Sequence, residues 1–249
     1  MVLAPPEEVA IARCCEERVV IAELLELDGR QILEIGCGRA ELTRELAQGG
    51  PGRQLLALEV DEVQHALNLE ITDLPNVRFE LAGAQALPAA DQSLDVVLLF
   101  KSLHHVPAAQ LDQSLREVAR VLRPGGFAYV SEPLFRGEFN QVLRLFHDES
   151  QARREAFEAV RRAVRSGALE LVSQTFFEVL ETFRDYAHFE QRILGATHTE
   201  FRLSAATERA VRARFERSAA PGGFSFRKPM RVDLLRRPDR RKPGPAVPA

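Results

Sequence analysis

The chain has few cysteines, little net charge and no long apolar run, and each of these shortages excludes a class of protein. Two of its three cysteines, Cys14 and Cys15, are adjacent, so the sequence offers no disulfide framework and predicts a reducing, cytoplasmic setting. The formal net charge of −3 gives no bulk attraction to nucleic acid. No apolar run approaches the roughly 18 residues of a membrane span, and the first residues do not resemble a signal peptide. We therefore expect a cytoplasmic protein that binds neither nucleic acid nor membrane.

What the chain does have is enough apolar sequence for one packed domain. Of its 249 residues, 45% are hydrophobic and 28% are charged, which is typical of a single globular α/β domain with a decorating insertion. A long amphipathic helix is predicted over residues 7–27, with Asp28 and Gly29 ending it. No internal repeat is visible, so we expect one domain over residues 1–249.

The stretch Gln31–Ala40 combines a short apolar run, a glycine turn and the start of an amphipathic helix. This pattern opens a nucleotide-binding α/β unit. Gly36 and Gly38 would let the backbone turn tightly and approach a ligand, and free N–H groups at the start of the helix would face its polar end. A dinucleotide fingerprint needs a third glycine or alanine where this chain has Glu41. Glu34, inside the strand, suits a ligand with a cationic end.

An acidic residue also ends the second predicted strand, Leu55–Leu58. The carboxylate of Glu59 could accept two hydrogen bonds from the ribose hydroxyls of a nucleoside. It follows Gly36 by 23 residues, which is the spacing expected of such a site. The alternative is a helix cap or a solvated acid, although Asp61 and Glu62 could cap the next helix themselves. We favour the ribose role.

Four motifs together resemble the class I S-adenosylmethionine-dependent methyltransferases, in particular those that act on small molecules. In chain order the motifs are Leu33-Glu34-Ile35-Gly36-Cys37-Gly38, Leu87-Pro88, Leu94-Asp95-Val96-Val97 and the run from Glu117 to Gly126. The resemblance covers about residues 30–132. It implies a Rossmann-like fold with a seven-stranded, mostly parallel sheet and helices on both faces. It also implies transfer of a methyl group from S-adenosylmethionine to a small-molecule acceptor.

One motif departs from the family pattern, at the position that would bind the adenine base. The family usually has an aspartate after the third strand, predicted here over Val77–Leu81, and Gly83 stands in its place. Either backbone groups of Ala84 and the side chain of Gln85 form the hydrogen bonds to adenine, or the alignment of this chain with the family motif is shifted by one residue. The cofactor-binding residues that the resemblance implies are Glu34, Gly36, Cys37, Gly38, Glu59, Val60, Gly83, Ala84, Gln85 and Phe100.

Two histidines, His104 and His105, follow the fourth predicted strand, Leu94–Phe100, at the end where open α/β sheets bind ligands. Similar methyltransferases often carry a histidine pair at this point. Either histidine could act as a general base for the acceptor's nucleophile, because imidazole titrates near neutrality. The alternative is a structural role in bonding a neighbouring loop. We predict no metal site, since the sequence shows no third ligand at a recognisable spacing.

From Pro133 the pattern changes. Residues 133–194 are amphipathic and rich in phenylalanine, and we predict a helical lid over the carboxyl ends of the strands. Its arginines between positions 153 and 165 could clamp an anionic group of the acceptor or lie on a solvated helix face. Residues 195–236 are predicted to form a sixth strand (Thr197–Leu203), a helix that starts at Ser204 and a seventh strand (Phe224–Leu235). The proline-rich residues 237–249 are predicted to be disordered.

Two other functions stay open. One is a nicotinamide-dependent oxidoreductase on the same type of fold, which Glu41 speaks against. The other is a non-catalytic nucleoside-binding protein, which the glycine at position 83 motivates. We expect a monomer or a homodimer.

Overall fold

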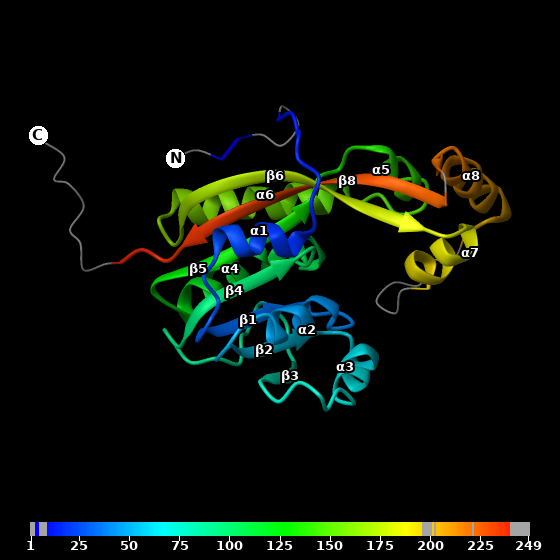
Figure 1. The fold of residues 1–249 in the computed structure, drawn as a ribbon. Coiled ribbons are helices and arrows are strands. Elements are labelled where there is room, and N and C mark those ends of the chain that lie inside the picture. Colours follow the sequence, from blue (N-terminus) through cyan, green and yellow to red (C-terminus); the bar gives the residue numbers. More distant parts are fainter. Residues whose placement is uncertain (1–2, 5–8, 196–200, 202, 221, 240–249) are drawn as a thin grey trace, which may run out of the picture.

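One mixed sheet organises the chain in the computed structural model, which describes residues 3–4, 9–195, 201, 203–220 and 222–239 (Figure 1). The strand order is β3-β2-β1-β4-β5-β8-β6, and a two-residue strand, β7, pairs with β8. The strands are β1 Gln31–Ile35, β2 Gln54–Glu59, β3 Val77–Leu81, β4 Leu94–Phe100, β5 Leu122–Pro133, β6 Glu170–Phe183, β7 Ala219–Ala220 and β8 Gly223–Arg236. Strands β3, β2, β1, β4 and β5 are parallel neighbours, and β8 is antiparallel to both β5 and β6. The predicted seven-stranded, mostly parallel sheet is confirmed, with β7 as a short addition.

Helices cover both faces of this sheet, as predicted. Apolar side chains of α4 (Leu111–Val121) and α6 (Ser150–Arg165) pack on one face, and those of α1 (Glu17–Leu24) and α2 (Glu41–Gln48) pack on the other. Strand β4 is apolar almost throughout because its side chains are buried on both faces. The order of the strands reverses between β1 and β4, so their carboxyl ends flank the place where sheets of this type bind ligands.

The N-terminal helix is shorter than predicted. It begins at Glu17, whereas residues 5–8 lie outside the described part of the chain. The residues just before the helix are extended and bond to the edge strand β6: the N–H of Cys15 donates to the carbonyl of Glu178 at 2.9 Å, and the N–H of Glu178 donates to the carbonyl of Arg13 at 2.8 Å. This pairing covers an edge that would otherwise expose unpaired backbone groups.

The prediction that residues 133–194 are wholly helical is wrong for residues 170–183, which form strand β6. This segment is rich in β-branched and aromatic residues, which favour a strand when a partner strand is present. The helices of the region are α5 (Glu138–Leu143), α6, α7 (Tyr186–Phe189) and a π-helical turn over Glu190–Leu194. The predicted strand Thr197–Leu203 falls largely on residues that the structure does not describe. The next helix, α8 (Ala205–Glu216), begins as predicted, with the Ser204 hydroxyl accepting from the N–H of Thr207 at 3.1 Å.

Strands β6 and β8 form an antiparallel pair that extends beyond the rest of the sheet. We call this pair the β6–β8 hairpin, although residues 184–222 lie between the two strands in the chain. Strand β5 ends at Pro133, level with Met230, but the pairing of β6 with β8 continues to Phe183 opposite Phe224. Helices α5, α7 and α8 gather around this extension, to the right in Figure 1. Together they enclose a separate aromatic core, formed by Phe139, Val142, Phe183, Tyr186, Phe189, Val211, Phe215 and Phe226.

The C-terminal segment is only partly described. The N–H of Arg237 donates to the carbonyl of Gly126 at 2.8 Å, so β8 remains bonded to the start of β5. The disorder predicted for residues 237–249 falls mainly on residues 240–249, outside the described part of the chain.

Candidate cofactor and acceptor site

The glycine turn after β1 requires glycine for two separate reasons. Gly36 and Gly38 have φ angles of 75° and 52°, in the left-handed region that favours glycine. A Cβ atom on Gly36 would also lie 2.8 Å from the Cβ of Ser102, which follows β4. The N–H groups of Gly36 and Cys37 both donate to the carbonyl of Leu58 at 2.9 Å. The turn is therefore fixed between the ends of β2 and β4, at the carboxyl edge of the sheet.

Glu59 reaches this turn with its carboxylate. Its Oε2 accepts the N–H of Gly38 at 2.8 Å, and its Oε1 accepts the N–H groups of Val60 at 2.8 Å and Asp61 at 3.0 Å. These contacts occupy both lone pairs of Oε1 and leave one on Oε2. The cap of helix α3 (Glu62–Asn68) is Asp61, whose side chain accepts from the N–H groups of Val63 and Gln64. Asp61, and not Glu59, therefore caps the helix, so the helix-cap role considered for Glu59 does not apply.

Glu34 lies beneath the same turn and is almost fully buried. Its Oε2 accepts the hydroxyl of Thr43, from α2, at 2.6 Å. Burial raises the pKa of Glu34 to about 7, and the negative charge of Glu59 adds to the rise, while Thr43 and Lys101 oppose it. A carboxylate with this pKa can gain or lose its charge near neutral pH, and a cationic ligand would favour the charged form.

The side chain of Cys37 is buried and packs against the glycine turn and Asn68. Its thiol is buried, and the Asn68 side chain lies 3.4 Å from the sulfur while donating to the carbonyl of Gly38 at 2.8 Å. Burial raises the pKa of Cys37, with the charges of Glu34 and Glu59 adding to the rise, so the thiol stays protonated and unreactive. The structure gives Cys37 a packing role. Its predicted contact with a cofactor stays a prediction.

The residues predicted to surround adenine divide into exposed and buried sets. Val60 is 66% exposed directly beside Glu59, and Gln85 folds its carboxamide back over Gly83. Ala84 is buried in the core, and Phe100 is buried against Tyr129, with ring centroids 5.5 Å apart. The side chain of Val60 is thus exposed and that of Gln85 is half-buried, whereas those of Ala84 and Phe100 pack in the core.

Two further residues, Lys101 and Ser102, lie at the end of β4. Lys101 has a φ angle of 54°, an unusual conformation for a residue with a side chain and one that is common at functional sites. The hydroxyl of Ser102 is buried against Gly36 and has no hydrogen-bond partner among the described atoms. A buried polar group without a partner at this position can bond a ligand. Their place directly after the strand was the only signal in the sequence.

The two histidines have different surroundings. His104 is buried, with Nδ1 hydrogen-bonded to the carboxylate of Glu132 and Nε2 3.5 Å from Oε1 of Glu149. Burial alone would lower the pKa of His104, but Glu132 and then Glu149 raise it to about 9. His105 is exposed, and its ring centroid lies 4.1 Å from that of His104. This arrangement favours a structural role for His104 and leaves His105 closer to solvent.

Glu149 was not singled out by the sequence, because it precedes α6, far along the chain from the histidines. Its Oε2 pairs with Arg153, whose side chain is 8% exposed, and its Oε1 lies 3.1 Å from Nε2 of His147. Arg161 and Arg162 pair instead with Glu158 and Asp112 on the exposed face of the helix. Arg153 therefore belongs to the site, whereas Arg161 and Arg162 fit the solvated helix face.

A further pocket is lined by other residues. It is open, has a volume of about 680 Å³ and is lined by Val9, Ile11, Arg136, Glu178 and Arg227 among others. None of its lining residues is a predicted site residue.

Comparison with known proteins identifies the part of the chain that carries the glycine turn. Residues 32–126 match the family model described as "Methyltransferase domain". These residues form a methyltransferase domain. The resemblance predicted for residues 30–132 is confirmed, and the match supports S-adenosylmethionine as the cofactor.

Curated relatives of the methyltransferase domain match over limited lengths. Methyltransferase GfsG of Streptomyces halstedii is 33% identical over 118 residues, which are 46% of this chain and 41% of GfsG. The 27-O-demethylrifamycin SV methyltransferase of Amycolatopsis mediterranei is 37% identical over 103 residues, 39% of this chain and 36% of the relative. The bifunctional biotin biosynthesis protein BioHC of Cellvibrio japonicus is 30% identical over 192 residues, 72% of this chain and 37% of the relative. The chain thus spans less than half the length of these relatives.

Solved structures confirm the fold over a longer range. The YcgJ protein of Bacillus subtilis superposes with a TM-score of 0.60 at 15% identity, covering 89% of this chain and 97% of YcgJ. The [4+2]-cyclase SpnF superposes with a TM-score of 0.59 at 20% identity, covering 88% of this chain and 79% of SpnF. At these identities the similarity concerns the fold alone. Within the described residues, no helix has the length and apolar character needed to cross a membrane.

Proposed function

We propose that this chain transfers the methyl group of S-adenosylmethionine to a small-molecule acceptor. The observation that carries the proposal is the pair of acids at the glycine turn, with Glu59 bonded to the N–H of Gly38 and Glu34 buried beneath it. The relative named for 27-O-demethylrifamycin SV acts, by its name, on a small molecule. This similarity supports a small-molecule acceptor here.

The residues present fit the cofactor. A Cβ on Gly36 would meet Ser102, the space beside Gly38 is open, and Ser102 offers a hydroxyl without a partner among the described atoms. Glu34 would face the cationic methionine end, and the remaining lone pair of Glu59 would accept from the ribose. Bound there, S-adenosylmethionine would supply a methyl group activated by its positively charged sulfur. Val60 and Gln85 would flank the adenine, with Gln85 in place of the absent aspartate.

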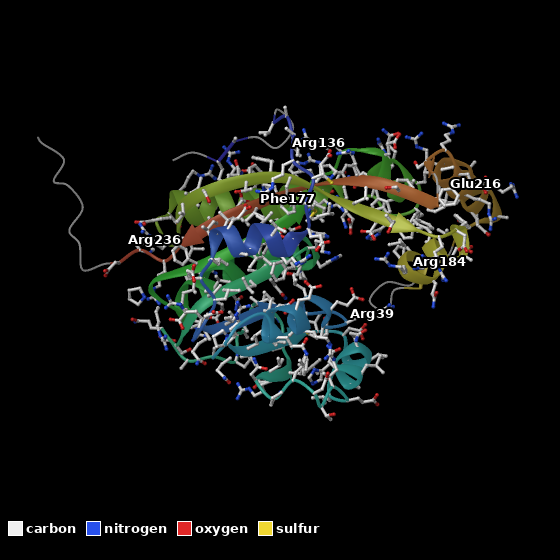
Figure 2. All side chains as sticks on the ribbon, in the orientation of Figure 1. Arg39, Arg136, Phe177, Arg184, Glu216 and Arg236 are labelled. Atoms are coloured by element: carbon white, nitrogen blue, oxygen red, sulfur yellow. The ribbon has the colours of Figure 1, made fainter. Side chains whose placement is uncertain are left out.

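The acceptor would lie at the same edge, beneath the β6–β8 hairpin. In the view of Figure 2, Arg39 of the glycine turn and Arg184 of the hairpin tip lie toward the same end of the molecule. Most of the rate enhancement would come from holding the nucleophile in line with the methyl group in a site that excludes water. We assign to His105 the contact with the acceptor and to His104 the positioning of this loop, because both ring nitrogens of His104 face carboxylates.

The shared fold does not fix the reaction, since one structure of this shape is titled a [4+2]-cyclase. A second candidate is therefore a protein that binds S-adenosylmethionine without transferring its methyl group. The glycine in place of the usual aspartate at position 83 motivates this candidate.

The two candidates differ in whether label leaves the cofactor. The protein is incubated with methyl-labelled S-adenosylmethionine and a small-molecule extract, and the products are separated by mass. Methyl transfer predicts label in a small molecule and release of S-adenosylhomocysteine, both reduced in His105→Ala. Binding of the cofactor with no labelled product would support the second candidate, and label only in macromolecules would contradict the small-molecule acceptor.

A further inference from the structure

Three side chains with metal-binding atoms meet beside the proposed acceptor position. His104 and His105 lie in the 3₁₀ turn after β4, and Glu149 lies just before α6. One ligand atom from each of the three falls within 4.8 Å of the others. The sequence could not predict this group, because the histidine pair and the glutamate belong to distant segments. They meet because α6 packs against the 3₁₀ turn that follows β4.

The spacing within this group suits a small divalent ion. Nε2 of His104 lies 3.5 Å from Oε1 of Glu149. Two ligands at about 2.0–2.1 Å from a tetrahedral zinc ion lie roughly 3.3–3.4 Å from each other. His104 and Glu149 therefore already hold nearly the separation that a shared zinc ion requires. A ligand atom of His105 lies within 4.8 Å of a ligand atom of each of these two residues, so His105 is the third member of the group.

Neighbouring groups orient both of the buried ligands. Glu132 bonds Nδ1 of His104, and its Oε1 also accepts the N–H of Leu103 at 2.9 Å. Nε2 of His104 is consequently directed at Glu149. Arg153 holds the other oxygen of Glu149. A histidine whose second nitrogen is bonded to a carboxylate is the usual arrangement around a protein-bound zinc ion.

We propose that His104, His105 and Glu149 bind one Zn²⁺ ion. Two histidines and one glutamate leave a fourth tetrahedral position open, as catalytic zinc sites do. His105 is exposed and Glu149 is half-buried, so the group borders solvent, and water or an oxygen or nitrogen atom of a ligand could occupy this position. The inference goes beyond the proposed methyl transfer and does not depend on it.

The test measures metal binding directly, with no cofactor or acceptor present. Cys14 and Cys15 are not buried and could bind zinc themselves, so the measurements use the full chain carrying Cys14→Ser and Cys15→Ser. Zinc is titrated calorimetrically, and Co²⁺ then replaces it as a spectroscopic probe. We expect one equivalent of zinc and the strong visible absorption of four-coordinate Co²⁺ without a thiolate band.

Variants distinguish a metal site from a cluster that shares only protons. His105→Ala removes an exposed ligand with little risk to folding and should abolish stoichiometric binding. Glu132→Gln should weaken zinc binding by about 10–100-fold, as loss of an outer partner does. Glu155→Gln, a change at a half-buried acid on the same helix that lies outside the cluster, is the matched control and should bind like the parent. Stoichiometric binding with unchanged affinity in His105→Ala would overturn the proposal. So would a parent protein that binds no zinc or gives no Co²⁺ spectrum, since the cluster would then be a proton-sharing network only.

Discussion

The two halves of this molecule encode their structure differently. In residues 31–132, short motifs place functional groups within a few residues of the strand ends that hold them, as Glu34, Gly36 and Glu59 do. In residues 133–236, the aromatic core depends on α5, α7, α8 and the β6–β8 hairpin meeting through long-range contacts. The structure of the first half can therefore be predicted from short stretches of sequence. The structure of the second half can be predicted only when the segments that pack together are known. If this distinction is right, substitutions in the aromatic core should alter stability and substitutions in the motifs should alter binding.

The largest effect should come from Phe215→Ala. The Phe215 ring is fully buried and contacts several other aromatic rings of the hairpin core, including Phe183 and Phe226. Truncation should lower the free energy of unfolding by about 3–5 kcal/mol, measured by urea denaturation. The control Leu180→Ala removes a side chain that is 57% exposed on the same hairpin and should change stability little. An equal loss in the two variants would contradict the existence of a separate aromatic core.

Gly36→Ala should act on binding as well as on the backbone. The added Cβ would meet Ser102 and force a left-handed φ angle on alanine, at a cost of about 1–3 kcal/mol. We expect S-adenosylmethionine binding to weaken by more than about tenfold in calorimetric titrations. Gly29→Ala has a similar φ angle of 71° but open space around it, so it should reduce stability and leave binding intact. If both variants lost binding, the cause would be general backbone strain and not a specific role of the glycine turn at Gly36.

Glu59→Ala should weaken S-adenosylmethionine binding by about 1–3 kcal/mol, because charge-assisted hydrogen bonds are lost. Glu59→Gln keeps the size of the side chain and should recover only part of the affinity. Glu62→Ala, an exposed acid on α3, is the control for the loss of one negative charge. An unchanged dissociation constant in Glu59→Ala would remove Glu59 from the site.

The smallest predicted effect is a pH dependence set by Glu34, whose pKa is about 7. A cationic ligand favours the ionised carboxylate, so affinity should rise as pH rises toward this pKa and as more of Glu34 becomes charged. Between pH 5.5 and 7 we expect a roughly tenfold gain, while the amino group of the ligand stays mostly protonated. Glu34→Gln should remove the dependence. A slope that persists in this variant would assign the titration to another group.

The strands in the first half of the fold, and the positions of Glu34, Gly36 and Glu59 in the candidate site, could be predicted from the sequence. The apolar runs of β1 and β2 end at a glycine and an acid that mark their boundaries, and β4 is apolar almost throughout, so these strands and the positions of Glu34 and Glu59 could be predicted. Strand β6 was missed because its aromatic residues also suit a helix, and only pairing with β8 decides between the two. Glu149 and Ser102 were missed because their roles depend on which distant segments they contact.

The central claim is that the acids at the glycine turn bind S-adenosylmethionine, and one titration tests it most directly. Wild-type protein and the double variant Glu34→Gln, Glu59→Gln are titrated with S-adenosylmethionine at pH 7.5 under identical conditions, after thermal unfolding has shown that both are folded. The account predicts one saturable site in the wild type and a large loss of affinity in the variant. Equal affinity in the two proteins, or no heat from the wild type at millimolar ligand, would contradict it.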